Sequence, residues 1–299
     1  MSGFAADWLK QRAPFDLAAR STELALGFRA ALRRDRGDAS SSVRIIDLAA
    51  GTGANFRALA PLLGGDQDWL LVDYDPLLIA AQTGEINVWA QQHGWCCSAM
   101  ADGVLVESEG SQWRVRSQQL DLAQSLERLD LEACAGVTTT AFLDLVSAAW
   151  LDKLAALLAH FNLPLLATLS VDGRREWQPS AVSDMHIQQA FLRHQAGDKG
   201  FGIALGEQAT PYLKRCLTAH EYRTVSAHSD WKIGADHAVM LLQMAREAAI
   251  ITQEVHPEAS IETMQWLAQR TAQISARALT LQVGHVDLLA VPASSATVT

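Results

Sequence analysis

The chain has 299 residues, of which 49% are hydrophobic and 19% charged, so it can bury a full core and is not a disordered sequence. Its net charge of −9 at pH 7 argues against nucleic acid or an anionic membrane as the main partner, because both attract basic surfaces. The four cysteines lack metal-ligand spacing and predict free thiols in a reducing cytoplasm. No segment predicts a signal peptide or a membrane-spanning helix.

Residues 1–32 predict two helices, because apolar residues recur at helical spacing and Pro14 interrupts the pattern. A polar linker follows at 33–42, and residues 43–55 then read as a buried strand, a glycine turn and the start of a helix. Gly51 and Gly53 allow backbone N–H groups to approach a ligand closely, and the positive end of the helix points at the same place. This stretch predicts a nucleotide-like ligand.

Strands and helices alternate over the rest of the chain. This order predicts an α/β fold with a doubly wound, mostly parallel, Rossmann-like sheet. Expected strands lie at 68–75, 104–106, 113–116, 136–140, 163–169, 222–227 and 279–290, the last with a bulge at Gly284. Residues 172–206 predict a long loop with short helices, of the kind that forms a lid.

We expect one domain over residues 1–292, followed by a tail at 293–299. Within it, 1–42 form an N-terminal helical cover, 43–170 a cofactor-binding half, and 171–292 a substrate or lid half. Two predicted helices, at 235–251 and 261–278, are inserted before the last strand and are expected to build a cap or an oligomer surface, such as that of a homodimer.

The glycine turn alone does not identify its ligand. A dinucleotide fold uses the pattern G-x-G-x-x-G, but here the third glycine position holds Phe56, which disfavours a dehydrogenase. Asp73 lies 20 residues after Gly53, at the end of the second strand, where an acid can accept both ribose hydroxyls of an adenosine cofactor. That spacing fits NAD and S-adenosylmethionine equally.

Four segments, in order, resemble the motifs of class I S-adenosylmethionine-dependent methyltransferases. They are residues 47–53 (DLAAGTG), 72–76 (VDYDP), 120–122 (LDL) and the strand and loop at 138–145. The resemblance covers roughly residues 43–170 and implies S-adenosylmethionine as the cofactor. The cofactor-binding residues that it implies are Asp47, Ala49, Gly51, Gly53, Asp73, Tyr74, Asp121, Leu122, Thr138 and Thr139.

Two departures from the family pattern are visible. Ala49 stands where many members have glycine, and threonines at 138–140 stand where many have an acid, asparagine or proline. In similar methyltransferases an N-terminal helix covers the cofactor, so Arg20 is expected to pair with the methionine carboxylate, the alternative being a solvated helix arginine. The helices at 235–278 also depart from the family, whose last two strands usually form a tight hairpin.

Methyl transfer needs positioning and, for a hydroxyl or amine, a base. His194 in the irregular segment is a candidate base or substrate contact, against the alternative of a surface histidine. Asp230 follows the strand at 222–227 and is expected at its carboxyl end, where ligands bind; the alternative is a polar turn. No His, Cys, Asp or Glu cluster has the spacing of a metal site.

These observations predict a cytoplasmic methyltransferase acting on a small-molecule acceptor, with neither nucleic acid nor a membrane as partner. The weak candidates for a base keep a second class open. It comprises non-catalytic S-adenosylmethionine-binding proteins and enzymes that run another reaction on the same fold.

Overall fold

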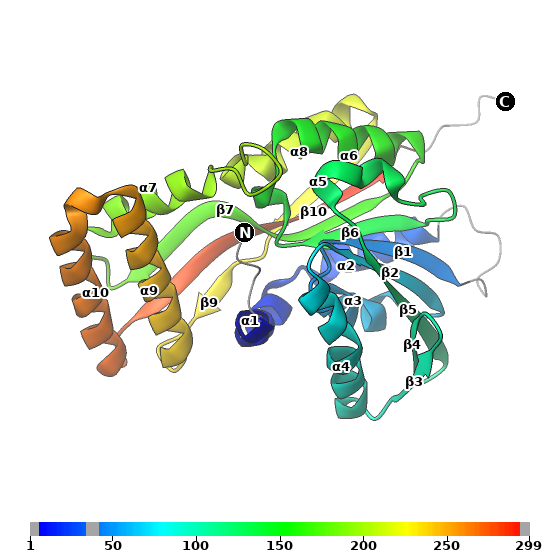
Figure 1. The fold of residues 1–299 in the computed structure, drawn as a ribbon, viewed down its shortest axis with the longest axis horizontal. Coiled ribbons are helices and arrows are strands. Elements are labelled where there is room, and N and C mark those ends of the chain that lie inside the picture. Colours follow the sequence, from blue (N-terminus) through cyan, green and yellow to red (C-terminus); the bar gives the residue numbers. More distant parts are fainter. Residues whose placement is uncertain (1–5, 34–41, 294–299) are drawn as a thin grey trace.

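The sheet in the computed structural model has ten strands, in the order β3-β4-β5-β2-β1-β6-β7-β10-β8, with β9 paired to β10 (Figure 1). The model describes residues 6–33 and 42–293, so residues 34–41 of the predicted linker and the predicted tail at 294–299 lie outside the described residues. Strands β5, β2, β1, β6 and β7 run parallel, whereas β10 is antiparallel to its neighbours β7 and β8. The predicted α/β class with a mostly parallel sheet is confirmed.

The strands are β1 (Val43–Leu48), β2 (Gln67–Asp73), β3 (Cys96–Met100), β4 (Gly103–Ser108), β5 (Ser111–Gln119), β6 (Gly136–Thr140), β7 (Leu165–Gln178), β8 (Tyr222–His228), β9 (Trp231–Ile233) and β10 (Thr280–Pro292). The central strands β1, β2 and β6 are almost wholly buried, as apolar runs in a sheet covered on both faces should be.

Helices cover both faces of the sheet (Figure 1). One core joins the sheet to α2 (Thr22–Leu32), α3 (Ala54–Leu63) and α4 (Pro76–Gln92). The other joins it to α5 (Leu122–Ser125), α6 (Ala148–His160) and α8 (Ala209–Ala219). No helix among residues 6–33 and 42–293 is long and apolar enough to cross a bilayer.

A third core lies beyond the main sheet, at the end of the molecule where α7 (Asp184–Gln195), α9 (Ala238–Val255) and α10 (Ser260–Ser275) stand (Figure 1). It forms because β7 runs much further than predicted, to Gln178, and remains paired with β10 from Gln178 with Thr280 to Leu165 with Ala290. The helical insertion predicted before the last strand is therefore present and packs on this sheet extension.

The long loop with short helices predicted at 172–206 is wrong at its start. Residues 172–178 continue β7, because this part of the chain pairs with β10 and buries Trp177, whereas α7 at 184–195 agrees with the helices expected in the segment. The charged residues of this segment do not predict a strand, because it forms by pairing with residues more than a hundred positions away. The bulge predicted at Gly284 is confirmed by the register shift between Val283 and His285.

The predicted helix break at Pro14 is also misplaced. Helix α1 (Ala6–Ala19) continues through Pro14, and the chain breaks at Arg20 and Ser21 instead. Ser21 caps α2 by accepting a hydrogen bond from Leu24 N at 3.2 Å. The Arg12 and Asp16 side chains form an ion pair across the proline at 2.9 Å, which supports the helix on both sides of it.

The junction between α1 and α2 is fixed to the sheet by Asp287, which is fully buried on β10. Its carboxylate accepts hydrogen bonds from Ser21 N and from Leu169 N, both at 2.8 Å. Two backbone donors on one carboxylate hold the N-terminal helices against the carboxyl ends of the parallel strands.

Candidate functional site

The glycine turn lies at the carboxyl end of β1, between β2 on one side and β6 on the other. This is the place where the strand order reverses and where ligands bind in open α/β sheets. Gly51 and Gly53 have φ values of 55° and 79°, a region that glycine adopts without steric cost. A Cβ at Gly51 would meet only Leu9 of α1, at 3.6 Å, so α1 covers the turn.

Side chains from two elements hold the turn in place. Asp73, the last residue of β2, accepts a hydrogen bond from Gly51 N at 2.7 Å and another from Asp75 N at 2.9 Å. Gln82 on α4 donates to Gly51 O at 2.7 Å. Asp73 is buried, at 8% exposed, so its carboxylate is part of the framework of the turn.

A chain of buried polar groups lies beneath the turn. Asn55 donates to Asp47 Oδ1 at 2.7 Å and accepts from Arg20 Nη1 at 2.7 Å, so it joins the carboxylate to the guanidinium. Asp47 Oδ2 and Arg20 Nε are both buried without a hydrogen-bond partner. Burial raises the pKa of Asp47 to about 7, against the hydrogen bond from Asn55 and the charge of Arg20. Burial also lowers the pKa of Arg20.

The three threonines at 138–140 have different hydrogen-bond partners. Thr138 donates to Leu166 O at 2.8 Å and accepts from Asn55 Nδ2 at 3.0 Å, and Thr139 donates to Leu48 O at 2.9 Å, so both hydroxyls are engaged within the protein. Thr140 and Thr168 instead accept from Arg20, at 3.0 and 2.7 Å. Sequence reasoning assigned Thr138 and Thr139 to the site and missed Asn55, Thr140 and Thr168, whose signal is their contact with Arg20 across the fold. The direct cofactor contact predicted for Thr138 and Thr139 has no free hydroxyl to support it.

The predicted third motif lies beside Asp73, because Leu120 N donates to Asp73 O at 2.9 Å. Asp121 caps α5 by accepting from Ala123 N at 2.9 Å, and Leu122 is 3% exposed. Tyr74, which follows Asp73, has 62% of its surface exposed. These residues therefore form one side of the region that the glycine turn borders.

The structure adds Asp144, which sequence reasoning did not select. It lies on the short 3-10 turn Leu143–Leu145 that follows β6, and it is 5% exposed with Oδ1 lacking a hydrogen-bond partner. Burial raises its pKa to about 6, against backbone hydrogen bonds from its own N–H and from Val171. A buried carboxyl with a free oxygen at the carboxyl end of a central strand is a candidate base.

His194 and Asp230, the predicted catalytic residues, are not joined to the turn by any contact among the described residues. His194 lies in the last turn of α7. Its carbonyl accepts a hydrogen bond from Lys199, and its Nε2 lies 3.9 Å from Glu254 of α9. Asp230 accepts two hydrogen bonds from Arg174, at 2.7 and 3.1 Å, and others from Gln282 and from His285 N. Burial opposes ionisation of Asp230, but the Arg174 contact outweighs it and lowers the pKa. The surroundings give Asp230 a structural role.

Among the described residues, Asp172, His228 and Asp230 come close enough to hold a metal, with one ligand atom of each within 4.8 Å of the others. Arg174 donates to both carboxylates, at 2.5 and 2.7 Å, so a guanidinium already neutralises the cluster. We assign no metal to it.

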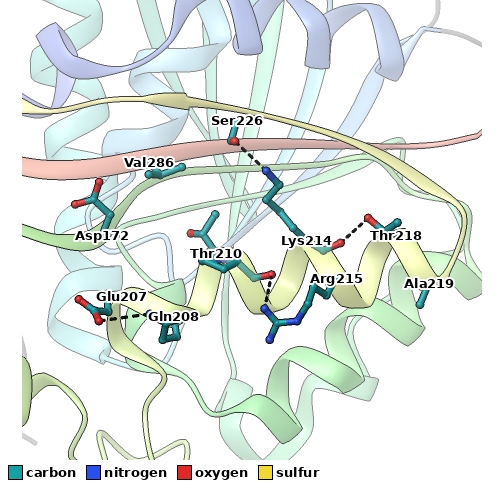
Figure 2. A pocket seen from close by; sticks show the side chains of 11 residues that line it. Asp172, Glu207, Gln208, Thr210, Lys214, Arg215, Thr218, Ala219, Ser226 and Val286 are labelled. Atoms are coloured by element: carbon teal, nitrogen blue, oxygen red, sulfur yellow. Dashed lines mark hydrogen bonds between the residues drawn. The ribbon is translucent and has the colours of Figure 1, made fainter.

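A groove of about 910 Å³ runs along α8 beside β8 (Figure 2). Lys214 crosses it to donate to Ser226 at 3.1 Å, and Asp172 and Glu207 line one end (Figure 2). None of its lining residues belongs to the glycine turn or to the predicted site. The groove is therefore distinct from the candidate site.

Ala49 occupies the turn at a φ of 52°, a left-handed conformation that costs an alanine about 1–2 kcal/mol. We expect Ala49→Gly to raise the free energy of unfolding by about 0.5–1 kcal/mol, since the relief exceeds the extra chain entropy of glycine. Urea unfolding of the wild type and the variant measures it. Ala50→Gly is the control. Ala50 has no positive φ, so this variant should be less stable than the wild type. Equal changes in the free energy of unfolding at both positions would contradict backbone strain at Ala49.

The order of the strands and the glycine turn define a Rossmann-like α/β protein with a nucleotide-type site. No protein-family model and no curated protein sequence matches the chain. Among solved structures, it is similar to an S-adenosylmethionine-dependent methyltransferase from Thiobacillus denitrificans bound to S-adenosylhomocysteine, at 14% identity and a TM-score of 0.42, over 96% of this chain and 98% of that one.

A methyltransferase from Geobacter sulfurreducens, also bound to S-adenosylhomocysteine, has 16% identity and a TM-score of 0.40, over 94% and 97% of the two chains. The [4+2]-cyclase SpnF has 15% identity and a TM-score of 0.39, over 91% and 80%. At TM-scores under 0.5 this likeness is remote, and the function must be inferred from the residues of the chain itself.

Proposed function

We propose that this protein binds S-adenosylmethionine at the glycine turn and transfers its methyl group to a small molecule. The observation that carries the proposal is the pair of unpartnered buried atoms beneath the turn, Asp47 Oδ2 and Arg20 Nε. One is a carboxylate oxygen and the other a guanidinium N–H, which suits the ammonium and carboxylate of an amino acid. The methionine end of S-adenosylmethionine carries both groups, whereas NAD carries neither.

The remaining residues fit the nucleoside end. Asp73 borders the turn, where its carboxylate can accept the ribose hydroxyls, and the open side of Gly51 leaves room for close approach. Asp121, Leu122 and Tyr74 are proposed to flank the adenine. Phe56, in place of a third glycine, is fully buried and packs at 5.4 Å on Trp69 and at 5.5 Å on Trp89, so a dinucleotide pattern was replaced by core packing.

The cofactor supplies an electrophilic methyl group on sulfur, and the protein supplies positioning. Arg20 and Asp47 hold the two charges of the amino acid, Asp73 fixes the ribose, and α1 excludes water above the turn through Leu9. Net charge of −9 continues to favour a small acceptor over nucleic acid. The cytoplasmic location and the homodimer remain predictions.

Calorimetry tests the cofactor. We expect S-adenosylhomocysteine to bind and NAD not to bind, because only the first offers an amino acid to Arg20 and Asp47. Arg20→Met should weaken S-adenosylhomocysteine at least tenfold, by loss of a charge-assisted hydrogen bond worth about 1.5–3 kcal/mol. Arg44→Met is the matched control, because Arg44 only pairs with exposed Asp130. Binding of NAD, or equal loss in both variants, would refute the assignment.

The competing class, a non-catalytic S-adenosylmethionine-binding protein or an enzyme with another reaction, is favoured by the engaged state of Asp230. Conversion of S-adenosylmethionine to S-adenosylhomocysteine in the presence of a metabolite pool separates the classes. Binding without conversion would support the competing one.

A further inference from the structure

We infer that Asp144 lines the methyl-transfer centre and takes the proton from an acceptor whose nucleophile is a hydroxyl or an amine. The inference rests on the proposed function and names the acceptor chemistry of the same site. Its first support is that Asp144 Oδ1 is buried and has no hydrogen-bond partner. A buried carboxylate oxygen left unpaired is costly, so it is expected to meet a donor that the free protein lacks.

Helix α1 covers the turn, and its charge reaches Asp144 only weakly. Leu9 Cδ1 would lie 3.6 Å from a Cβ at Gly51, whereas the positive charge of Arg12 is the smallest of the influences on the pKa of Asp144. A direct contact places Asp144 instead: its carboxylate accepts a hydrogen bond from the backbone N–H of Val171. Val171 lies three residues beyond Thr168, the last residue of β7 that pairs with β6, so Asp144 lies at the carboxyl edge of the parallel strands.

The strands give the same placement. Asp144 follows β6, and β6 lies beside β1, with Thr139 opposite Leu48 at the start of the glycine turn. Both segments leave the sheet at its carboxyl edge, where ligands of open α/β sheets bind.

Among the described residues, the charged groups on the elements around Asp144 are engaged elsewhere and do not form an ion pair with it. Strand β7, the 3-10 turn Gly206–Gln208 and α8 pack against its turn, and the charge of Arg12 on α1 acts on it weakly. From these elements Asp172, Glu207 and Lys214 line the separate groove along α8, while Arg12 is held by Asp16. Burial raises the pKa of Asp144 to about 6, so the carboxylate is mostly ionised at neutral pH yet basic enough to accept a proton.

The step balances in atoms and charge. A bond forms between the acceptor oxygen or nitrogen and the methyl carbon, while the bond from that carbon to sulfur breaks and its electron pair stays on sulfur. The acceptor proton moves to Asp144 Oδ1. One positive charge on sulfur and one negative charge on Asp144 disappear together, which favours the step in a dry site.

The test compares two ligands that differ in that charge. Aspartate carboxyl carbons are labelled with ¹³C, the Asp144 resonance is identified by its loss in Asp144→Asn, and its pKa is measured with S-adenosylmethionine and with S-adenosylhomocysteine bound. We expect the pKa to be at least about one unit lower with S-adenosylmethionine, because a positive charge nearby favours the carboxylate. Asp152, exposed on α6, is the control and should have the same pKa in both complexes.

Equal pKa values of Asp144 in the two complexes would overturn the inference while leaving the proposed function intact. Absence of binding by either ligand would instead overturn the proposed function, and the inference with it. Asp144→Asn should bind S-adenosylhomocysteine within twofold of the wild type, which shows that the variant is folded. With phenol or benzylamine as test acceptor, any methylation should fall roughly 100-fold in Asp144→Asn at pH 7.5, and an unchanged rate would contradict a role as base.

Discussion

Asp73→Ala is expected to weaken S-adenosylhomocysteine binding by about 1–3 kcal/mol, or roughly 5- to 150-fold. The carboxylate is proposed to accept the ribose hydroxyls, and the structure adds a second reason. Asp73 Oδ2 accepts the hydrogen bond from Gly51 N, so its loss also frees the turn that the ligand must approach. Calorimetric titration of the purified variant measures the change.

Asp75→Ala is the matched control for this experiment. Asp75 lies two residues away and caps α4 by accepting from Leu77 N at 2.8 Å, without a contact to the turn among the described residues. Its loss should cost about 0.5–2 kcal/mol of stability and leave affinity unchanged. If Asp73→Ala and Asp75→Ala weaken binding equally, or Asp73→Ala does not weaken it, the ribose assignment is wrong. Asp73→Asn, which keeps one acceptor for Gly51 N, should fall between the two.

The glycine turn and the sheet could be predicted because both depend on local sequence. Apolar runs such as the one at β1, and the glycines that follow it, must form a buried strand and a turn wherever they occur. Asp47 and Asp73 could be assigned for the same reason, since each has a fixed place on a strand. The extension of β7 could not be, because its partner in β10 lies more than a hundred residues away.

The catalytic assignments show the limit most directly. The sequence indicates His194 because it lies in an irregular segment and Asp230 because it follows the strand at 222–227, but their partners are Glu254 and Arg174, distant in sequence. Asp144 was overlooked within a motif that had been recognised, because nothing local indicates that its Oδ1 is buried and unpaired. Tertiary contacts decide which carboxylate oxygen is left without a hydrogen-bond partner, and these contacts cannot be predicted from the local sequence.

The same reasoning explains why the site is costly to the empty protein. Asp47 and Arg20, joined by Asn55, bring a carboxylate and a guanidinium out of water. Asp47 Oδ2 and Arg20 Nε are left without a partner. Leaving buried polar groups unpaired lowers stability, and a ligand that pairs them recovers it. Unpaired buried atoms beside a turn with left-handed φ values are therefore a stronger indication of a binding site than either feature alone.

S-adenosylhomocysteine binding is expected to release about 0.4 to 0.9 of a proton at pH 6 and almost none at pH 8.5. Burial raises the pKa of Asp47 to about 7 in the free protein, so at pH 6 its carboxyl is mostly protonated. A bound ammonium group favours the ionised form and should lower this pKa by about 1–3 units, which expels the proton. The heat of binding in buffers of different ionisation enthalpy measures the number released. S-adenosylhomocysteine is the right ligand because its uncharged sulfur should leave Asp144 undisturbed.

Asp47→Asn should abolish this release, since the amide does not titrate, and should weaken binding at least tenfold. The side chain keeps its shape and its acceptor for Asn55, so folding is preserved. The raised pKa also fixes the sign of the effect on stability. Between about pH 4 and pH 7 the folded protein holds a proton that the unfolded chain has lost, so this carboxyl makes the free energy of unfolding fall as pH rises. The variant lacks that loss and should be at least as stable as the wild type at pH 8. Proton release equal to that of the wild type would place the titrating group elsewhere.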